Sequence, residues 1–346
     1  MSILRKILYP FSVLYGKITS ARNIFYDKGY LRSTSFKIPT IVVGNLSVGG
    51  TGKTPMVEYL VRLLQDKYKI AILSRGYKRS TKGFKIADST STPEDIGDEP
   101  MQYYTKFKKV IVAVDSHRVH GIEQITKFFL KPDVILLDDA YQHRRVAAGL
   151  NILLTSYDNL YVDDTLLPSG NLRESKEGAN RAQIIVVTKC PDVLDNDEQF
   201  EITKKLKAQV HQTVFFSKIK YHNYIIGNKG NIATSILSKY NVLLVTGIAV
   251  TTPLTEFLRI NNIPFQHLKY ADHYNFSNKE KEKINSEYTK IKADNKLILT
   301  TEKDYIRSFM GIDNVYYFPI ETEFIDHQKD FNKLIRKYVE QSSRNS

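Results

Sequence analysis

The segment from residue 41 to residue 64 constrains the fold most, because an apolar run, a glycine-rich loop and a helical pattern follow one another. Residues 41–43 form a β-branched run that is typical of a buried strand. The next twelve residues read GNLSVGGTGKTP. Apolar residues then recur at intervals of three and four between Met56 and Leu64, which predicts an amphipathic helix. A strand, a glycine loop and a helix in this order indicate a phosphate-binding loop (P-loop).

This loop has the chemistry of a nucleotide site. Its glycines allow successive backbone N–H groups to point inward around a polyphosphate, at the positive end of the helix. We expect Lys53 to reach the outer phosphates and the Thr54 hydroxyl to hold Mg²⁺. Ser47 stands where the usual pattern has its first glycine. The predicted nucleotide-binding residues are Ser47, Val48, Gly49, Gly50, Thr51, Gly52, Lys53 and Thr54.

Further apolar runs predict an α/β fold, with a P-loop NTPase-like parallel sheet wound with helices. Continuous apolar runs of strand length are typical of strands that are covered on both faces, and helical patterns separate them here. The runs lie at residues 41–43, 70–73, 110–114, 134–137, 152–154 and 184–187.

The length of 346 residues suggests two domains. Residues 215–235 carry charged and aromatic residues and a turn-like Gly-Asn-Lys-Gly sequence, and we interpret them as a connection. A second α/β set follows, with strands near residues 242–245 and 297–299. We therefore expect an N-terminal helix within residues 1–35, a P-loop domain over residues 36–220 and a smaller C-terminal α/β lobe over residues 221–346.

Two adjacent acids follow one of the apolar runs. Residues 134–139 read VILLDD, an apolar strand that ends in Asp138 and Asp139. In a parallel sheet this strand ends at the same edge as the P-loop, so either carboxylate could meet Mg²⁺ there. The alternative is an ordinary strand that ends in a turn.

A nucleotide site does not identify the acceptor, and two segments are candidates. The first contains Asp98 and Glu99, and the second contains Asp272 and His273. Phosphoryl transfer to an alcohol needs a base near the hydroxyl, and a carboxylate oriented by a histidine suits that role. The alternative for Asp98 is a helix cap, because Glu99 and a proline follow it.

Composition limits the partners and the compartment. The net charge of +13 favours an anionic partner, although a lysine-rich surface is the plain alternative. We find no nucleic-acid-reading module and predict no obligate protein partner. The single cysteine, Cys190, excludes an internal disulfide and leaves no set of cysteine ligands for structural zinc, which favours a cytosolic protein. The sequence contains no apolar run of 18 residues, so it predicts no membrane span.

The N-terminal segment is basic and amphipathic. Residues 1–35 contain six Lys and Arg residues but only one acid, Asp27. Apolar residues recur at intervals of three and four, from Ile3 and Leu4 to Leu14 and Ile18. Such a helix can lie in a membrane interface with its cations near anionic headgroups. The alternative is an amphipathic helix that packs on its own domain.

Taken together, these segments resemble the tetraacyldisaccharide 4'-kinase family. The resemblance runs from about residue 8 to residue 310 and depends on the order of the motifs: GNLSVGGTGKTP, SRGY at residues 74–77, GDEP at 97–100, LDDAYQHRR at 137–145, LPSGNLRE at 167–174, DH at 272–273 and TEKD at 301–304.

The resemblance implies ATP- and Mg²⁺-dependent phosphorylation of the 4'-hydroxyl of tetraacyldisaccharide 1-phosphate, which gives lipid IVA in lipid A synthesis. The acceptor, an acylated glucosamine disaccharide 1-phosphate, implies peripheral attachment at the cytoplasmic face of the inner membrane of a Gram-negative bacterium. It implies Asp98 as the base, His273 as its partner after closure of the two lobes, and Lys53 on the phosphates. Asp138, Asp139 and Glu99 join Thr54 as implied metal contacts.

The resemblance also implies an acceptor-binding set. Tyr77 could stack on a sugar, and Arg75 and Arg173 could bind an anionic headgroup. The full set is Ser74, Arg75, Tyr77, Gln142, His143, Asn171 and Arg173. The chain departs from the family pattern at Ala140-Tyr141, in place of Gly-Phe, and at residues 169–171, where Asn171 replaces a common proline. For His143 a structural hydrogen-bonding role is the alternative.

Two other classes compete with a kinase. A membrane-associated switch ATPase of the deviant Walker A type has a similar loop, but it carries a signature lysine where this chain has Val48. A GTPase needs an N-K-x-D motif, and residues 188–192, TKCPD, match that motif imperfectly.

Overall fold

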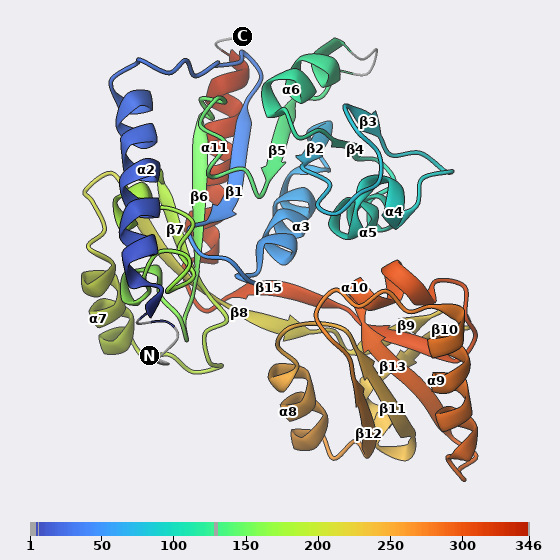
Figure 1. Cartoon of the computed structure of the whole chain (residues 1–346). Helices are drawn as coiled ribbons and strands as arrows, with labels where there is room; N and C mark the ends of the chain where they lie inside the picture. Colours follow the sequence, from blue (N-terminus) through green and yellow to red (C-terminus); the bar gives the residue numbers. More distant parts are fainter. Residues whose placement is uncertain (1–4, 6, 128–130, 345–346) are drawn as a thin grey trace. The chain divides into compact units, whose positions relative to one another are not determined.

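The chain forms two compact units. The computed structural model describes residues 5, 7–127 and 131–344. Unit 1 comprises Met1–Ile219 and Thr322–Ser346, and unit 2 comprises Lys220–Glu321. Both units combine a sheet with helices, so the α/β class predicted from the sequence is confirmed (Figure 1).

The P-loop strand lies near the middle of the sheet of unit 1. Within the described residues this sheet has nine strands in the order β15-β8-β7-β6-β1-β5-β2-β4-β3. Its strands are β1 (Thr40–Asn45), β2 (Ile70–Ser74), β3 (Lys85–Ile86), β4 (Ile111–Val114), β5 (Val134–Asp138), β6 (Leu150–Ser156), β7 (Ile184–Thr188), β8 (Thr213–Tyr221) and β15 (Ile320–Phe324). In this order, each pair of neighbouring strands from β8 to β4 is parallel, and β3 runs antiparallel to β4. Parallel strands end at one edge, so β1, β5 and β2 bring the P-loop, Asp138 and Ser74 together.

Helices cover both faces of this sheet. Alternate strand residues, among them Val42, Leu137 and Ile185, join one core with Ile122 and Ile202 from helices. The helices and 3₁₀ turns of unit 1 between β1 and β8 are α3 (Lys53–Leu64), α4 (Pro93–Ile96), α5 (Asp98–Lys106), α6 (Arg118–Lys127), η1 (Tyr161–Asp163), η2 (Lys176–Arg181) and α7 (Asn196–Leu206).

The last helix, α11 (Gln328–Arg344), belongs to unit 1, whereas the sequence led us to expect residues 221–346 in one lobe. Phe331 is fully buried, and its ring lies 5.8 Å from that of Tyr59 on α3. The Tyr338 hydroxyl donates to the Thr40 carbonyl of β1 and accepts from the Thr40 N–H. The chain therefore returns to unit 1 through β15, and α11 closes its core (Figure 1).

Unit 2 has its own sheet and two cores. The strand order is β10-β9-β14-β13-β11-β12 within the described residues, and β12, β11, β13 and β14 are parallel. One core includes Leu254 and Leu258, and the other includes Ile284. The elements are β9 (Tyr224–Gly227), β10 (Gly230–Ala233), η3 (Thr234–Lys239), β11 (Asn241–Thr246), α8 (Thr252–Ile260), β12 (Phe265–Lys269), α9 (Asn278–Lys290), β13 (Lys296–Thr301), α10 (Glu302–Asp304), η4 (Tyr305–Phe309) and β14 (Val315–Phe318).

The interpretation of residues 215–235 as a connection is wrong. This stretch contains most of β8 and all of β9 and β10. Buried and exposed positions mix along these strands, because they lie at the margins of their sheets. They consequently lack the continuous apolar runs by which the other strands can be recognised.

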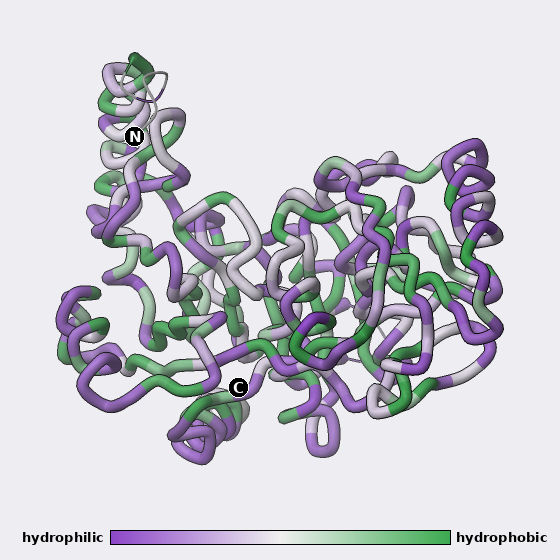
Figure 2. The backbone as a smooth tube through the Cα atoms, turned by 90° about the horizontal axis from the view of Figure 1, so that it is seen from below, coloured by the Kyte–Doolittle hydropathy of each residue, from purple (hydrophilic) through white to green (hydrophobic). Residues whose placement is uncertain are grey.

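The N-terminal helix α2 (Tyr9–Asp27) packs on unit 1 through its small residues. Ser12 and Gly16 are buried, and the Ser12 hydroxyl donates to Ser169 Oγ at 2.9 Å. The larger apolar side chains, Phe11, Leu14 and Ile18, are each about 60% exposed (62%, 59% and 62%). Figure 2 shows hydrophobic residues recurring along this helix, which carries the N label. Residues 1–4 and 6 of the predicted segment lie outside the described residues.

Among the described residues, no helix is both long enough and apolar enough to cross a membrane.

Candidate active site at the P-loop

The P-loop adopts the predicted form between β1 and α3. Gly49 and Gly52 have positive φ angles of 111° and 83°, which an L side chain rarely adopts, and α3 begins directly after Gly52. Two buried polar atoms of this region, Asn45 Nδ2 and Thr51 Oγ1, have no hydrogen-bond partner among the described residues. Unpaired buried polar atoms beside a helix N-terminus fit a site that is completed by a polar ligand.

Lys53 extends toward the edge of the sheet. Its Nζ lies 3.3 Å from Asn45 Oδ1 and 3.5 Å from an Asp139 carboxylate oxygen. The same carboxylate receives Arg173, whose Nη1 lies 3.0 and 3.1 Å from the two Asp139 oxygens. Burial alone would raise the pKa of Asp139, but the charges of Lys53 and Arg173 hold it below its ordinary value. The structure thus places one carboxylate between two cations that face the nucleotide loop.

Asp138 differs from its neighbour because it is more deeply buried. The Ser74 hydroxyl donates to Asp138 Oδ2 at 3.2 Å. Burial raises the pKa of Asp138 to about 6, and the nearby charges of Asp139 and Glu99 act in the same direction. The two acids therefore have opposite tendencies: Asp139 is held as a carboxylate, whereas Asp138 titrates close to neutral pH.

Two of the expected metal ligands, Thr54 and Asp138, have side chains of the kind that bind Mg²⁺. The described residues contain no group of three or more His, Cys, Asp and Glu side chains arranged to hold a metal ion. Thr54 and Asp138 nevertheless supply a hydroxyl and a carboxylate, and Mg²⁺ typically takes one or two such ligands and completes its shell with phosphate and water. The donor set fits Mg²⁺ that arrives with a nucleotide.

A buried phenol borders this donor set. The Tyr103 side chain on α5 is fully buried, and the negative charges of Asp138, Glu58 and Glu99 act on its hydroxyl. Burial, reinforced by these acids, holds the pKa of Tyr103 well above its ordinary value. The phenol is therefore a neutral hydroxyl at physiological pH.

Asp98 is the first residue of α5, and Gly97 precedes it as the N-cap. The Asp98 side chain is not the N-terminal cap that its sequence context suggested, because the capping position belongs to Gly97. Gly97 and Gly76 have positive φ angles, and a Cβ on Gly97 would lie 3.2 Å from Gly76 Cα. Two glycines thus allow the loop that carries Arg75 and Tyr77 to approach the residue before Asp98. Arg75 and Tyr77 are themselves exposed at this edge.

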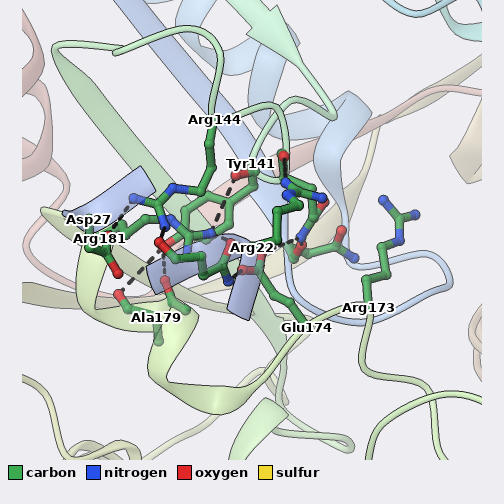
Figure 3. Close-up of polar contacts among 12 residues, drawn as sticks. Arg22, Asp27, Tyr141, Arg144, Arg173, Glu174, Ala179 and Arg181 are labelled. Carbon is green, nitrogen blue, oxygen red and sulfur yellow. Dashed lines mark hydrogen bonds and ion pairs between the residues drawn. The ribbon is translucent and has the colours of Figure 1, made fainter. Parts of the chain in front are cut away.

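Gln142 connects the loop after β5 to the P-loop. Its Nε2 donates to the Asn45 carbonyl at 2.8 Å and to Glu174 Oε1 at 3.0 Å. Glu174 also accepts from Asn23 on α2 at 2.7 Å and from Arg181 at 2.9 Å. Figure 3 shows this cluster around Glu174, with Arg173 pointing away from it. Gln142, a predicted acceptor contact, is therefore engaged in joining α2 to the nucleotide loop.

His143 follows in the same loop and is half-buried. Burial lowers the pKa of His143 to about 4, and the positive charges of Arg118, Arg75 and Arg22 act in the same direction. The imidazole is thus neutral at physiological pH, surrounded by cations that suit an anionic ligand.

Asn171 explains one departure from the family pattern. Its Nδ2 donates to Asp164 Oδ2 at 2.9 Å, and its N–H donates to the other carboxylate oxygen at 3.2 Å. The Asn171 carbonyl accepts from the Val48 N–H at 2.7 Å. A proline offers neither of the two donors that Asp164 receives. Asn171 therefore shapes the loop against the P-loop, and direct acceptor contact by its side chain stays a prediction.

His273 belongs to unit 2, in the loop after β12. It is half-buried, and its Nδ1 lies 3.5 Å from Arg307 Nη2. The predicted pairing of Asp98 with His273 joins a residue of unit 1 to a residue of unit 2, and it stays a prediction.

Two charged residues of this site escaped the sequence analysis. Arg118 is 2% exposed and donates to the carbonyls of Asp115 and Asp138 at 2.5 and 3.4 Å. Burial lowers its pKa to about 10, so it remains a cation at neutral pH. Glu174, the acid of the cluster around Gln142, is the second. A signal for Arg118 existed, because residues 115–118 follow β4 at the same sheet edge as the P-loop.

The comparison with protein families decides the assignment. A family model described as Tetraacyldisaccharide-1-P 4'-kinase matches residues 4–340. The chain belongs to this family. The resemblance seen in the sequence motifs is thereby confirmed over almost the whole chain.

Curated relatives and a solved structure agree with this assignment. The chain is 52% identical to a tetraacyldisaccharide 4'-kinase of Flavobacterium johnsoniae over 344 residues, which cover 99% of both chains. It is 47% identical to a tetraacyldisaccharide 4'-kinase of Flavobacterium psychrophilum over the full length of both. Its fold is similar to that of LpxK from Aquifex aeolicus, an "apo" form solved in complex with ATP, with a TM-score of 0.79 and 31% identity over 97% of this chain and 100% of that chain.

The family assignment identifies the chain as a kinase and thereby confirms the enzyme class predicted from the P-loop. The roles predicted for individual residues are not settled by a family match.

Proposed function

We propose that the chain transfers the γ-phosphate of ATP to the 4'-hydroxyl of a tetraacylated glucosamine disaccharide 1-phosphate, in lipid A synthesis. The observation that carries this proposal is the position of Lys53, which lies between Asn45 and Asp139 beside two buried polar atoms, Asn45 Nδ2 and Thr51 Oγ1, that have no hydrogen-bond partner among the described residues. Members of the same family named for this activity cover 99% or more of the chain.

ATP would occupy the P-loop, residues 47–54, with its phosphates on backbone N–H groups at the start of α3. Lys53 would then exchange its contacts with Asn45 and Asp139 for the outer phosphates. Arg173 Nη1 contacts both Asp139 oxygens, so this carboxylate keeps a cationic partner when Lys53 turns to the nucleotide.

Mg²⁺, when bound, would be held by Thr54 and Asp138, with Asp139 and Glu99 as further candidates, and would neutralise charge that develops on the phosphates. Ser74 orients Asp138 through the hydrogen bond to Oδ2. Because ligands bind metals in their deprotonated form, the raised pKa of Asp138 predicts metal binding that weakens below about pH 6.

Asp98 would act as the general base. It accepts the proton of the 4'-hydroxyl while that oxygen forms a bond to the γ-phosphorus, the bond from this phosphorus to its bridging oxygen breaks, and ADP leaves. Its place in the first turn of α5 puts its carboxylate at the positive end of a helix. His273 would orient this carboxylate.

The acceptor's anionic group would meet a cationic surface. Arg75 and Tyr77 are exposed near Gly97, and burial together with nearby arginines lowers the pKa of His143 and keeps it neutral. Arginine guanidinium groups bind phosphate in a bidentate manner, and an exposed tyrosine can stack on a sugar. These features support binding of the disaccharide 1-phosphate by Arg75, Tyr77 and neighbouring residues.

Helix α2 would attach the enzyme to an anionic membrane at the cytoplasmic face of the inner membrane. Its small and polar face is bonded to unit 1, so its larger apolar side chains, including Phe11, Leu14 and Ile18, are left exposed on the other side. An apolar helix face with nearby cations is the usual composition of an interfacial helix. An acylated acceptor in the bilayer gives this attachment a purpose.

The transfer reaction itself can be tested directly. Labelled γ-phosphate from ATP should appear on tetraacyldisaccharide 1-phosphate in detergent micelles, and ATP without lipid is the control. Lys53→Met and Asp98→Asn should each abolish product, and Asp98→Asn should leave ATP affinity nearly unchanged, because the base acts in the transition state. Asp66→Asn, at an exposed acid beyond the C-terminal end of α3, is the matched control.

Two outcomes would contradict the proposal. Full activity of Asp98→Asn would remove this residue from the mechanism. ATP hydrolysis that liposomes stimulate, without phosphorylated lipid, would instead favour the switch ATPase.

The membrane role of α2 needs its own experiment. The triple variant Phe11→Ser, Leu14→Ser and Ile18→Ser should lose co-sedimentation with anionic liposomes while keeping its Tm, because these side chains are exposed. Val193→Ser with Phe200→Ser changes exposed apolar residues elsewhere in unit 1 and is the control. Unchanged liposome binding by the triple variant would show that α2 is a packing element alone.

A further inference from the structure

Three loops meet at one edge of the sheet of unit 2. The parallel strands β12, β11 and β13 are neighbours, so the loops that follow them gather at their common carboxyl end. These loops contribute Gly247 after β11, residues 270–277 after β12 and the TEKD motif, residues 301–304, around the end of β13 (Figure 1). The TEKD motif has no function in the mechanism proposed above.

Asp304 holds these loops together. Its side chain is fully buried, and its Oδ2 accepts from the Gly247 N–H at 2.9 Å and from the Thr301 hydroxyl at 2.7 Å. Its other oxygen, Oδ1, receives Arg307 Nη1 at 3.1 Å. A Cβ on Gly247 would lie 3.0 Å from Asp304 Oδ1, so the approach of the carboxylate requires glycine or some local adjustment. The carboxylate is thus a fixed acceptor for Arg307.

Arg307 connects Asp304 to His273. Its side chain is 8% exposed. Nη1 donates to Asp304 and also to the Tyr274 carbonyl at 3.3 Å, while Nη2 lies 3.5 Å from His273 Nδ1 in hydrogen-bonding geometry. A guanidinium carries N–H donors and no acceptor. His273 Nδ1 must therefore present a lone pair, and a neutral imidazole in this arrangement carries its proton on Nε2.

The backbone of His273 is constrained from the other side. Its φ angle is +57°, in the left-handed region that a residue with a side chain rarely adopts. Its N–H donates to the Gly247 carbonyl at 2.9 Å. Gly247, whose N–H binds Asp304, therefore also holds the main chain of His273. The backbone and the ring of His273 are thus positioned by the same cluster.

We propose that Asp304 and Arg307 are positioning residues that hold His273 as the Nε2–H tautomer, so that Nε2, which lies 4.0 Å from Asp272 Oδ2, carries the ring proton. The proposal rests on the function assigned above to His273 in the reaction. In this tautomer Nε2 can act only as a hydrogen-bond donor, so the histidine orients a carboxylate and does not take up the hydroxyl proton through this nitrogen. The TEKD motif serves the reaction through His273, without contact with the reacting atoms.

The tautomer can be measured without any turnover. Histidine labelled with ¹³C and ¹⁵N in the full-length protein gives ring shifts that distinguish Nε2–H from Nδ1–H, and His273→Gln identifies the signal of His273 among those of the eight histidines. We expect the Nε2–H form near neutral pH. Arg307→Met should give a mixture of tautomers, whereas Arg307→Lys, which keeps a donor, should largely retain Nε2–H. A wild-type signal of the Nδ1–H form would overturn the proposal, and this result needs no variant that might misfold.

Kinetics provide the second readout. Arg307→Met should lower kcat about tenfold or more, as expected when an orienting partner is lost, with the KM for ATP nearly unchanged. Arg307→Lys should restore part of kcat. The control is Arg259→Met, at an exposed arginine of α8 in the same unit.

The two readouts separate this proposal from the function on which it rests. If His273→Gln keeps full kcat, the assignment of His273 to the reaction fails, whatever its tautomer. If His273→Gln loses activity while Arg307→Met keeps both kcat and the Nε2–H signal, the positioning pair is refuted and the function of His273 stands.

Discussion

A carboxylate oxygen of Glu58 lies 2.7 Å from Lys106 Nζ, and this pair joins the P-loop helix α3 to α5, the helix that begins at Asp98. Glu58 is 1% exposed, and it also accepts from Gln102 at 2.8 Å. The helix that positions the nucleotide and the helix that carries the proposed base are therefore tied by one buried acid.

Replacing this acid should be costly. Glu58→Ala removes the acceptor of the buried Gln102 and the carboxylate that pairs with the partly exposed Lys106, so we expect the free energy of unfolding to fall by about 1–3 kcal/mol. Urea denaturation followed by circular dichroism measures the change. Glu201→Ala, in an exposed pair with Lys204 at 3.9 Å, should change it by less than about 0.5 kcal/mol. Equal stability of the two variants would mean that the buried pair contributes nothing.

His143 should make the folded state sensitive to acid. The unfolded chain takes up a proton on this residue near its ordinary pKa of 6.5, whereas the folded protein does so only at about 4. The unfolded state therefore binds more protons between these values, and stability falls as the pH drops from about 6.5 to about 4. Allowing for partial exposure, this contribution is about 1–2 kcal/mol.

The measurement for His143 compares two pH profiles. Urea unfolding of the wild type and of His143→Gln should diverge through this window, with the wild type losing more stability toward low pH. Parallel profiles would show that the imidazole titrates normally in the folded protein.

Cys190 should be chemically inert in the folded protein. Burial raises the pKa of its thiol from 9.0 to about 12, so the reactive thiolate is about a thousandfold scarcer at a given pH. We expect slow reaction with an aromatic disulfide reagent under native conditions and rapid reaction in guanidinium chloride. Cys190→Ser with Val193→Cys moves the thiol to a position that is 84% exposed and should react at once. Fast native labelling of the wild type would place Cys190 at the surface.

The C-terminal helix should depend on a tyrosine hydroxyl. Tyr338→Phe removes two hydrogen bonds to the Thr40 backbone and should cost about 1–2 kcal/mol of stability. Gly149→Ala should cost about 1–3 kcal/mol, because its Cβ would collide with the same hydroxyl. The double variant should be more stable than the sum of the two losses predicts, since the closest colliding atom is gone and only the ring carbons, 2.9 and 3.0 Å from the added Cβ, remain. Strict additivity in urea unfolding would rule out this steric coupling.

The nucleotide loop could be predicted because its information is local. The β-branched run before Gly44, the glycines and the apolar periodicity of α3 all lie within residues 41–64, and the chemistry of a P-loop depends on that order alone. The two acids after β5 were equally accessible, because parallel topology fixes the edge at which a strand ends. The different environments of these two acids could not be predicted, since the burial of Asp138 and the pairing of Asp139 depend on tertiary contacts.

The parts that escaped prediction depend on distant partners. The periodicity of an amphipathic helix such as α11 predicts an apolar face but does not indicate which core that face covers. The packing of α11 on unit 1 therefore could not be predicted from the sequence. The helical pattern of α2 likewise did not reveal that Ser12 and Gly16, the small residues, face the protein. Arg118 was missed because a buried arginine is recognisable only once the groups that neutralise it are in place.

The return of the chain to unit 1 has a consequence for synthesis on the ribosome. Phe324 and Phe331, whose rings lie 6.0 and 5.3 Å from that of Phe215, are translated more than a hundred residues after it, when all of unit 2 has already been synthesised. The nascent P-loop unit must wait for these residues with an open apolar flank, exposed to chaperones and proteases. A message truncated anywhere within unit 2 therefore yields a chain that contains every P-loop residue and still lacks the means to complete the fold around them.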